Sequence, residues 1–154
     1  MQAQQVMTGN PRTIPGSETM GKALETMLAH GLHMLPVVDA SGGVLGVVTM
    51  YSILAHIVPD YIVSGDLESV SYVPDIGLLQ RQYTVRAGQP VTAAMDAEAL
   101  LVKPDASLLS VAAALISHDR HAYALVADEH KTLLGVVSAA DILRHLGNGG
   151  AAVA

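Results

Sequence analysis

The apolar positions along the chain follow one pattern twice. A stripe at helical spacing comes first, two short apolar runs around a turn-rich gap follow, and a second helical stripe ends each copy. Short runs of this kind around a turn are typical of β-hairpins. The runs are 35–38 and 44–48 in the first copy, and 123–127 and 133–137 in the second. The pattern predicts helix, strand, strand, helix in each copy, after a short extended segment at 12–15 or 101–103.

The helical stripes have matching members in the two copies. Ser17 and Asp105 are the expected N-caps of the first helices. The first stripes are Met20, Ala23, Leu24, Met27 and Leu28, and Leu108, Val111, Ala112, Leu115 and Ile116; the second stripes are Met50, Ile53, Leu54, Ile57 and Val58, and Ala139, Ile142, Leu143 and Leu146.

A displacement of 88 residues superimposes the copies, and an extra residue in the second hairpin raises it to 89. Met7 then falls on Met95 and Gly46 on Gly135. We therefore expect an α/β (α+β) fold of two pseudo-symmetric repeats. The expected boundaries are repeat one at 1–58, a linker or insertion at 59–90 with a short helix at 76–82, repeat two at 91–147, and a flexible tail at 148–154.

Composition narrows the classes of protein. Hydrophobic residues make up 51% of the 154 residues and charged residues 14%, so apolar surface is expected to meet another subunit. The net charge of −6 argues against a broad nucleic-acid or anionic-membrane footprint. The chain has no cysteine, and we see neither a secretory signal nor an apolar run of membrane-spanning length. A cytoplasmic location and no membrane insertion are expected.

The ordered motifs resemble a pair of CBS domains, known as a Bateman module. The segments that carry the resemblance are Met7, 35–39 and 46–49 in the first copy, and Met95, 101–107 and 135–143 in the second. The resemblance implies copies packed through their sheets, a homodimer of two modules, and adenosine-containing ligands in clefts between the copies. It further implies a regulatory sensor of AMP, ADP or ATP, with no required cofactor. Such a sensor signals to a regulated partner, here unknown, through ligand-dependent dimer geometry.

The best candidate site begins where the last predicted strand meets the last helix. By the resemblance, the Ser138 hydroxyl contacts phosphate and the Asp141 carboxylate accepts both ribose hydroxyls. Two acceptor oxygens suit a vicinal diol, and helix N-termini favour anions. Alternatively, Ser-x-x-Asp is an ordinary capping pair, in which each side chain satisfies a backbone amide of the helix start. In the first copy Thr49 retains the hydroxyl but Ser52 replaces the aspartate, which predicts one good site per chain.

Further ligand-binding residues follow from the resemblance. Leu101, Val102 and Lys103 would line the adenine end, although Val102 could simply pack in the core. His33 and His121 precede the hairpins and could supply donors near phosphate, or could interact with the last carbonyls of a helix. Tyr123 and Thr49 complete the expected set, and Lys103 and Arg120 could reach a polyphosphate or be solvated surface residues.

Other classes of function fit the sequence less well. A dimerisation module without ligand and an S-adenosylmethionine-type sensor stay open as alternatives. No nucleophile elbow, Walker loop or convincing carboxylate pair is present, so no enzyme activity and no catalytic residues are expected. His30 and His33 are spaced like a pair of metal ligands, but no third ligand lies nearby in the sequence, so no metal site is expected.

Overall fold

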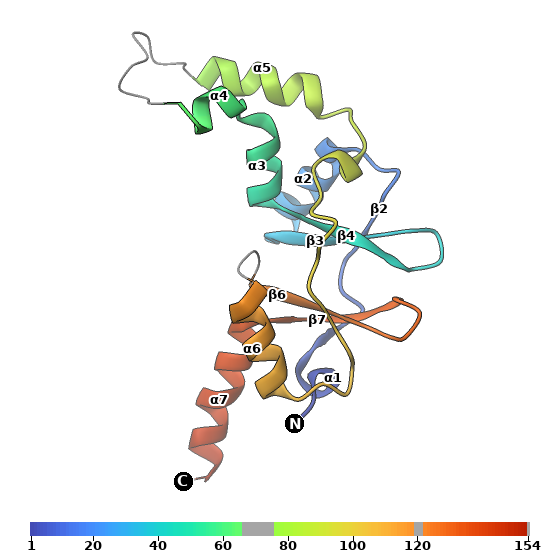
Figure 1. Ribbon diagram of the computed structural model, residues 1–154, viewed down its shortest axis with the longest axis vertical. Helices are drawn as coiled ribbons and strands as arrows, with labels where there is room; N and C mark the ends of the chain where they lie inside the picture. The colour runs from blue at the N-terminus through green and yellow to red at the C-terminus, as the bar shows by residue number, and fades with distance from the viewer. Residues whose placement is uncertain (66–75, 119–121, 154) are drawn as a thin grey trace. The chain divides into compact units, whose positions relative to one another are not determined.

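The computed structural model describes residues 1–65, 76–118 and 122–153, which form two compact units (Figure 1). We call them the repeat-one unit (Ile14–Val37 and Gly46–Ala97) and the repeat-two unit (Met1–Thr13, Val38–Leu45 and Glu98–Ala154). The elements of repeat one are β2 (Ile14–Pro15), α2 (Met20–Ala29), β3 (Met34–Val38), β4 (Val44–Thr49) and α3 (Met50–Ile57), followed by α4 (Asp60–Val63), α5 (Ile76–Arg86) and η2 (Val91–Ala93). The repeat-two unit contains α1 (Ala3–Val6), β1 (Thr8–Gly9), β5 (Leu101–Val102), α6 (Leu108–His118), β6 (Tyr123–Ala127), β7 (Leu133–Ser138) and α7 (Ala139–Val153).

Each repeat has the predicted order of a short leading strand, helix, strand, strand and helix, so the predicted fold class is confirmed. Repeat one forms a sheet of order β2-β3-β4 and repeat two a sheet of order β1-β7-β6-β5. In the second sheet β5 runs parallel to β6, whereas β7 runs antiparallel to β6 and β1. Helices α6 and α7 lie side by side against this sheet (Figure 1).

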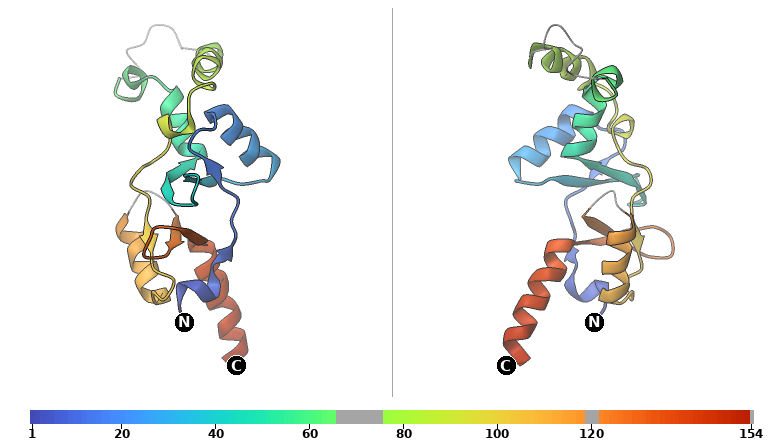
Figure 2. Two further views of the ribbon diagram at one scale, coloured as in Figure 1. Left: turned by 90° about the vertical axis from the view of Figure 1, so that its right-hand side faces the viewer. Right: turned by 60° about the vertical axis from the view of Figure 1, so that its left-hand side comes forward.

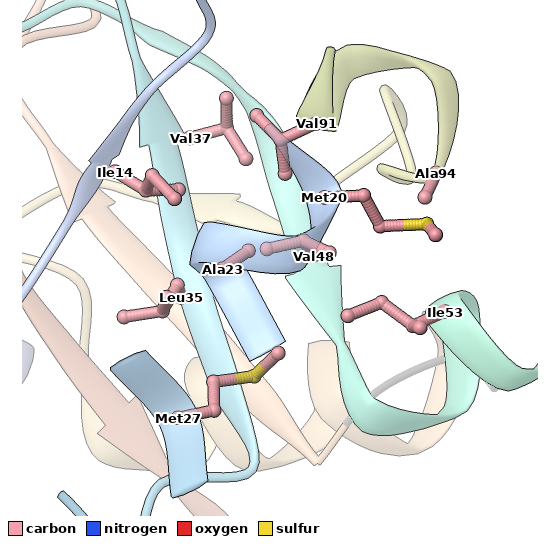
Figure 3. Packing of buried hydrophobic residues seen from close by; sticks show 10 residues of the cluster. All are labelled: Ile14, Met20, Ala23, Met27, Leu35, Val37, Val48, Ile53, Val91 and Ala94. Atoms are coloured by element: carbon pink, nitrogen blue, oxygen red, sulfur yellow. The ribbon is translucent and has the colours of Figure 1, made fainter. Parts of the chain in front are cut away.

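Apolar residues on one face of each sheet and on the facing helices form a separate core in each unit. Figure 3 shows the repeat-one core, in which α2, the strands and α3 enclose Met27, Leu35 and Val48. The repeat-two core contains Val111 and Val137. The outermost members of the predicted helical stripes do not belong to these cores: Leu28, Leu54, Ile116, Leu143 and Leu146 are 51–80% exposed. A stripe of four or five apolar residues covers more of the helix circumference than the sheet can bury.

The caps of the first helices differ from the prediction. Thr19 accepts a hydrogen bond from the Lys22 amide at 3.1 Å, and Ser107 accepts one from the Ser110 amide at 3.1 Å. Both caps lie two residues after the expected Ser17 and Asp105. The preceding residues instead form matching turns, in which the amides of residues 18 and 106 donate to the carbonyls of residues 15 and 103.

The segments that lead into the repeats are exchanged between the units. The Ala3 amide donates to the Ala106 carbonyl at 2.8 Å, and the Val91 amide donates to the Glu18 carbonyl at 2.7 Å. Helix α1 accordingly lies beside α7 (Figure 2). The continuous repeats expected at 1–58 and 91–147 therefore differ from the spatial units, because residues 1–13 and 91–97 each pack on the opposite repeat.

Two glycines make this exchange possible. A side chain on Gly135 would meet Met7 Sδ at 2.5 Å, and one on Gly46 would meet Met95 Sδ at 3.0 Å. These are the methionines and glycines that the repeat displacement superimposes. Each leading segment packs against the last strand of the opposite repeat at a residue that has no side chain.

The tips of the two hairpins pair with each other inside the repeat-two unit. The Val44 amide donates to the Lys131 carbonyl at 2.9 Å, and the Leu133 amide donates to the Gly42 carbonyl at 3.2 Å. In each tip an aspartate carboxylate, Asp39 or Asp128, accepts backbone amides two and four residues later. The turn chemistry is therefore duplicated together with the strands.

The segments between and after the repeats contain more helix than the pattern predicts. Helix α5 covers Ile76–Arg86 where 76–82 was the prediction, and Arg86 Nη1 donates to the His56 carbonyl at 2.9 Å, which attaches α5 to the end of α3. Helix α7 continues to Val153, through residues expected to form a tail. Within the described ranges, no helix combines the length and the apolar character needed to cross a bilayer.

Candidate functional site

The candidate site starts at the junction of β7 and α7. Strand β7 ends at Ser138 and α7 begins at Ala139, so the N-terminal backbone amides of a 15-residue helix lie at this junction. The Asp141 amide donates to Ser138 Oγ at 3.0 Å, and the Ser138 amide donates to Asp141 Oδ2 at 2.9 Å. The two residues form a capping pair, in which the side chain of each accepts the backbone amide of the other. It fixes the rotamers of the two side chains that the resemblance assigns to ligand binding.

Tyr123 is the expected site residue that the sheet brings next to this junction. In the antiparallel pairing of β6 and β7, Tyr123 and Ser138 are direct partners. The Ala139 amide donates to the Ala122 carbonyl at 2.9 Å, which continues the ladder into the first residue of α7. Partners in an antiparallel pair have side chains on the same face. Tyr123 and Ser138 therefore share one face of the sheet.

The residues expected at the adenine end lie on the next strand along. Leu101 is in register with Leu125 and Val102 with Val126. Val102 packs against the repeat-two core, as the alternative interpretation of this residue predicted. Leu101 therefore belongs to the opposite face of the sheet, the one that also carries Tyr123 and Ser138, since side chains alternate along a strand.

Lys103 lies away from the junction. It follows Val102 and is therefore level with the end of β6, four residues from the level of Tyr123 and Ser138. Four residues of strand span about 13 Å. The Lys103 side chain is exposed. The structure thus groups Ser138, Asp141 and Tyr123 closely, places Leu101 at an intermediate distance and leaves Lys103 at the far end.

Asp141 has one charged neighbour that the sequence motifs do not single out, Arg144. Its Nη1 donates to Asp141 Oδ1 at 3.1 Å. The Asp141 side chain is 21% exposed and that of Arg144 67%. An acidic and a basic residue three positions apart on a helix are a recognised pairing signal, so this contact could have been predicted from the sequence.

The corresponding junction in repeat one is also a capping pair, but an uncharged one. Thr49 Oγ1 accepts the Ser52 amide at 2.9 Å, and Ser52 Oγ accepts the Thr49 amide at 2.9 Å. Thr49 is buried, at 6% exposure. His33 is exposed directly before β3, and its carbonyl accepts the Met50 amide at 3.0 Å. Both Thr49 and His33 belong to the repeat-one unit.

Two expected contacts cannot be placed. His121 and Arg120 lie outside the described residues. Among the residues that are described, no cluster of three or more histidine, aspartate or glutamate side chains could hold a metal ion.

A family comparison identifies the two duplicated stretches. The model described as CBS domain matches residues 3–59 and 83–148, which together are most of the chain. The chain belongs to the CBS domain family. The matched stretches contain both hairpins and both junctions, so the expected tandem CBS pair is confirmed.

Solved CBS proteins share the fold over nearly the whole chain. A Bacillus anthracis CBS domain-containing protein of unknown function has a TM-score of 0.75 at 15% identity and covers 96% of this chain and 94% of its own. CBSX2, solved in complex with AMP, has a TM-score of 0.73 at 21% identity, with 97% and 98% covered. The CBS domain pair of protein MJ0100, solved with 5′-methylthioadenosine and S-adenosyl-L-methionine, has a TM-score of 0.69 at 15% identity, also with 97% and 98% covered.

The curated relatives that match are longer proteins. An uncharacterized protein of Methanocaldococcus jannaschii is 28% identical over 141 residues, which are 92% of this chain and 31% of that protein. A homoserine O-acetyltransferase of Methanocorpusculum labreanum is 30% identical over 88 residues, which are 56% of this chain and 17% of that protein. This chain therefore spans less than a third of either relative.

Proposed function

We propose that this CBS pair is a regulatory module that binds an adenine nucleotide through its second repeat and signals the bound state to a partner protein. The observation that carries the proposal is the difference between the two junctions. Both have the same capping geometry, but only the repeat-two junction includes a carboxylate, Asp141, that is partly exposed. The uncharged hydroxyl pair of repeat one suffices for capping, so capping alone does not require the carboxylate of Asp141.

The proposed contacts assign each group a role. Asp141 accepts the ribose hydroxyls, the Ser138 hydroxyl and the first amides of α7 receive phosphate, and Leu101 and Tyr123 contact the base from the same face of the sheet. The complexes of CBSX2 with AMP and of the MJ0100 domain pair with adenosyl ligands support an adenosine-containing ligand. The MJ0100 complex also keeps a sensor of the S-adenosylmethionine type as the alternative.

We further propose that the chain is regulatory rather than catalytic. The acetyltransferase among its relatives shares only 17% of its own length with this chain, so its activity is not transferred. A ligand changes a regulatory equilibrium only if it binds two arrangements with different affinity. We propose that these arrangements are those of a homodimer. The regulated partner and the cytoplasmic location stay predictions.

Isothermal titration with AMP, ADP, ATP and S-adenosylmethionine tests the site. An Asp141→Asn variant retains an oxygen for the cap but loses the charge and one acceptor. Hydrogen bonds to charged groups contribute about 1.5–3 kcal/mol, so we expect at least about a tenfold loss of nucleotide affinity. Asp105→Asn, which removes the same charge from an exposed residue of the same unit, should bind like the wild type.

Two results would contradict the proposal. Absence of binding by the wild-type protein to all four ligands would leave the structural-module alternative. Unchanged affinity in Asp141→Asn would place the ligand elsewhere in the fold.

A further inference from the structure

The ion pair between Asp141 and Arg144 is a second difference between the repeats. Arg144 Nη1 lies 3.1 Å from Asp141 Oδ1. At the displacement of 89 residues, Asp141 corresponds to Ser52 and Arg144 to Ala55. Repeat one thus lacks both the negative charge and its counter-charge, whereas the hydroxyl and the backbone geometry of the junction are shared. This joint difference associates Arg144 with the task of Asp141 rather than with capping.

A carboxylate that binds a ribose diol creates an electrostatic difficulty for a nucleotide. The diol and the 5′-phosphate are attached to the same five-membered ring, so the phosphate charge is held close to the carboxylate. At separations below the Debye length, about 8 Å at physiological ionic strength, like charges repel with little screening. Uncompensated, Asp141 would favour neutral or cationic adenosyl ligands over phosphorylated ones.

We propose that Arg144 is a specificity-determining residue that compensates the charge of Asp141 and thereby allows an anionic nucleotide to bind. This inference rests on the proposed function. The Arg144 side chain is 67% exposed and reaches the carboxylate from one helical turn further along α7, on the Oδ1 side.

The hydrogen-bonding capacity of Asp141 permits this role. Its Oδ2 accepts the Ser138 amide and its Oδ1 accepts Arg144. A carboxylate has about four lone-pair sites, so two remain for the two hydroxyls of a ribose. Arg144 therefore need not leave when the ligand binds, and the amide bond to Oδ2 keeps the carboxylate oriented with or without Arg144.

The test compares three adenosyl ligands that differ in charge: AMP, adenosine and S-adenosylmethionine. In an Arg144→Gln variant we expect AMP affinity to fall about three- to fivefold, the upper part of the range of an exposed charge pair. Adenosine affinity should stay within about twofold, and S-adenosylmethionine, which carries a sulfonium cation, should bind at least as well as before. Arg144→Lys should restore the preference for AMP, because it restores the charge.

Two controls separate charge compensation from a structural role. Arg12→Gln removes the same charge from an exposed residue of the same unit and should leave all three affinities unchanged. Raising the ionic strength should reduce the preference for AMP over adenosine in the wild type more than in Arg144→Gln.

The outcomes distinguish this inference from the proposed function. If Arg144→Gln leaves the ratio of AMP affinity to adenosine affinity unchanged, Arg144 does not set specificity. Binding that depends on Asp141 would still support the proposed function in that case. If the wild type binds none of the three ligands, both fail. A changed AMP-to-adenosine ratio that Arg144→Lys reverses supports the inference.

Discussion

At the scale of single residues, the hairpin tip of repeat two contains a backbone conformation that its side chain disfavours. Lys131 has φ of 62°, and its counterpart in repeat one is Gly42 with φ of 86°. The left-handed conformation costs an ordinary residue about 1–2 kcal/mol, which is partly offset by the larger entropy that glycine loses on folding. We expect Lys131→Gly to raise the free energy of unfolding by about 0.5–1 kcal/mol in urea titration.

The neighbouring Glu129 provides the control, since it is not in the left-handed region. Glu129→Gly should lower the stability because it only adds freedom to the unfolded chain. Equal losses in both variants would show that Lys131 is not strained.

Asp39 gives a residue-scale prediction about pH. The Ser41 hydroxyl first, and then the amides of Gly43 and Ser41, hold the pKa of the Asp39 carboxyl below its ordinary value. The folded state therefore favours the ionised form, and this stabilisation is present above the unfolded pKa of about 3.9. It is lost as the pH falls from there through the lowered folded pKa.

We therefore expect the difference in Tm between wild type and Asp39→Asn to shrink from about pH 6 to about pH 3. Ser41→Ala removes the hydrogen bond that lowers the pKa of Asp39 most. It should therefore also weaken the pH dependence of Tm, but by less than Asp39→Asn does. A difference in Tm that does not vary with pH would contradict this account.

At the scale of elements, the pairing of β1 with β7 depends on Gly135. A Cβ there would lie 2.5 Å from Met7 Sδ and 2.8 Å from the Thr8 carbonyl oxygen. The backbone oxygen cannot move without breaking the pairing of β1 with β7. We expect Gly135→Ala to destabilise the protein by about 1–3 kcal/mol, measured by thermal and urea unfolding.

Gly147 is the matched control, since it lies in α7 and a Cβ there meets nothing within 4 Å. Gly147→Ala should stabilise by up to about 1 kcal/mol. Combining Gly135→Ala with Met7→Ala should cost less than the sum of the two single changes, because the second removes one of the clashing atoms. Strict additivity would show that a side chain at position 135 does not clash with Met7.

The elements also show what the sequence could predict. Short apolar runs around a turn-rich gap predict the hairpin strands to within one residue of their observed ends, because such runs are local information. The repeat displacement pairs Met7 with Met95 and Gly46 with Gly135, but it does not reveal that each methionine packs on the glycine of the opposite repeat. Which repeat a leading segment packs on depends on the path of the chain in space, and local pattern contains nothing about it. Similarly, Ser138 and Asp141 could be found by motif, whereas the exposure of Asp141 and the distance of Lys103 required the sheet register.

At the scale of the whole molecule, the exposed apolar residues on the repeat helices occupy equivalent positions. Leu28 corresponds to Ile116 and Leu54 to Leu143, and they are 66%, 80%, 51% and 67% exposed. Duplicated apolar positions on helices that already bury their other face indicate that each unit has an apolar surface that is covered in the functional protein. A self-complementary surface of this kind suits the proposed homodimer, since an isologous interface uses the same patch on both subunits.

Substitution of Leu143 tests this assembly. Burial of a leucine side chain contributes about 1.5–3 kcal/mol, and a two-fold dimer contains the residue twice, so Leu143→Asp should raise the dissociation constant at least about a hundredfold. Sedimentation equilibrium over a range of concentrations measures this change. Val85→Asp is the control, because Val85 is also exposed, at 73%. It lies on α5, which follows the helices and hairpin of repeat one in the sequence and precedes those of repeat two. This variant should leave the dissociation constant unchanged. A Leu143→Asp variant that stays dimeric, or a wild type that sediments as a monomer, would contradict a homodimer formed through these apolar positions.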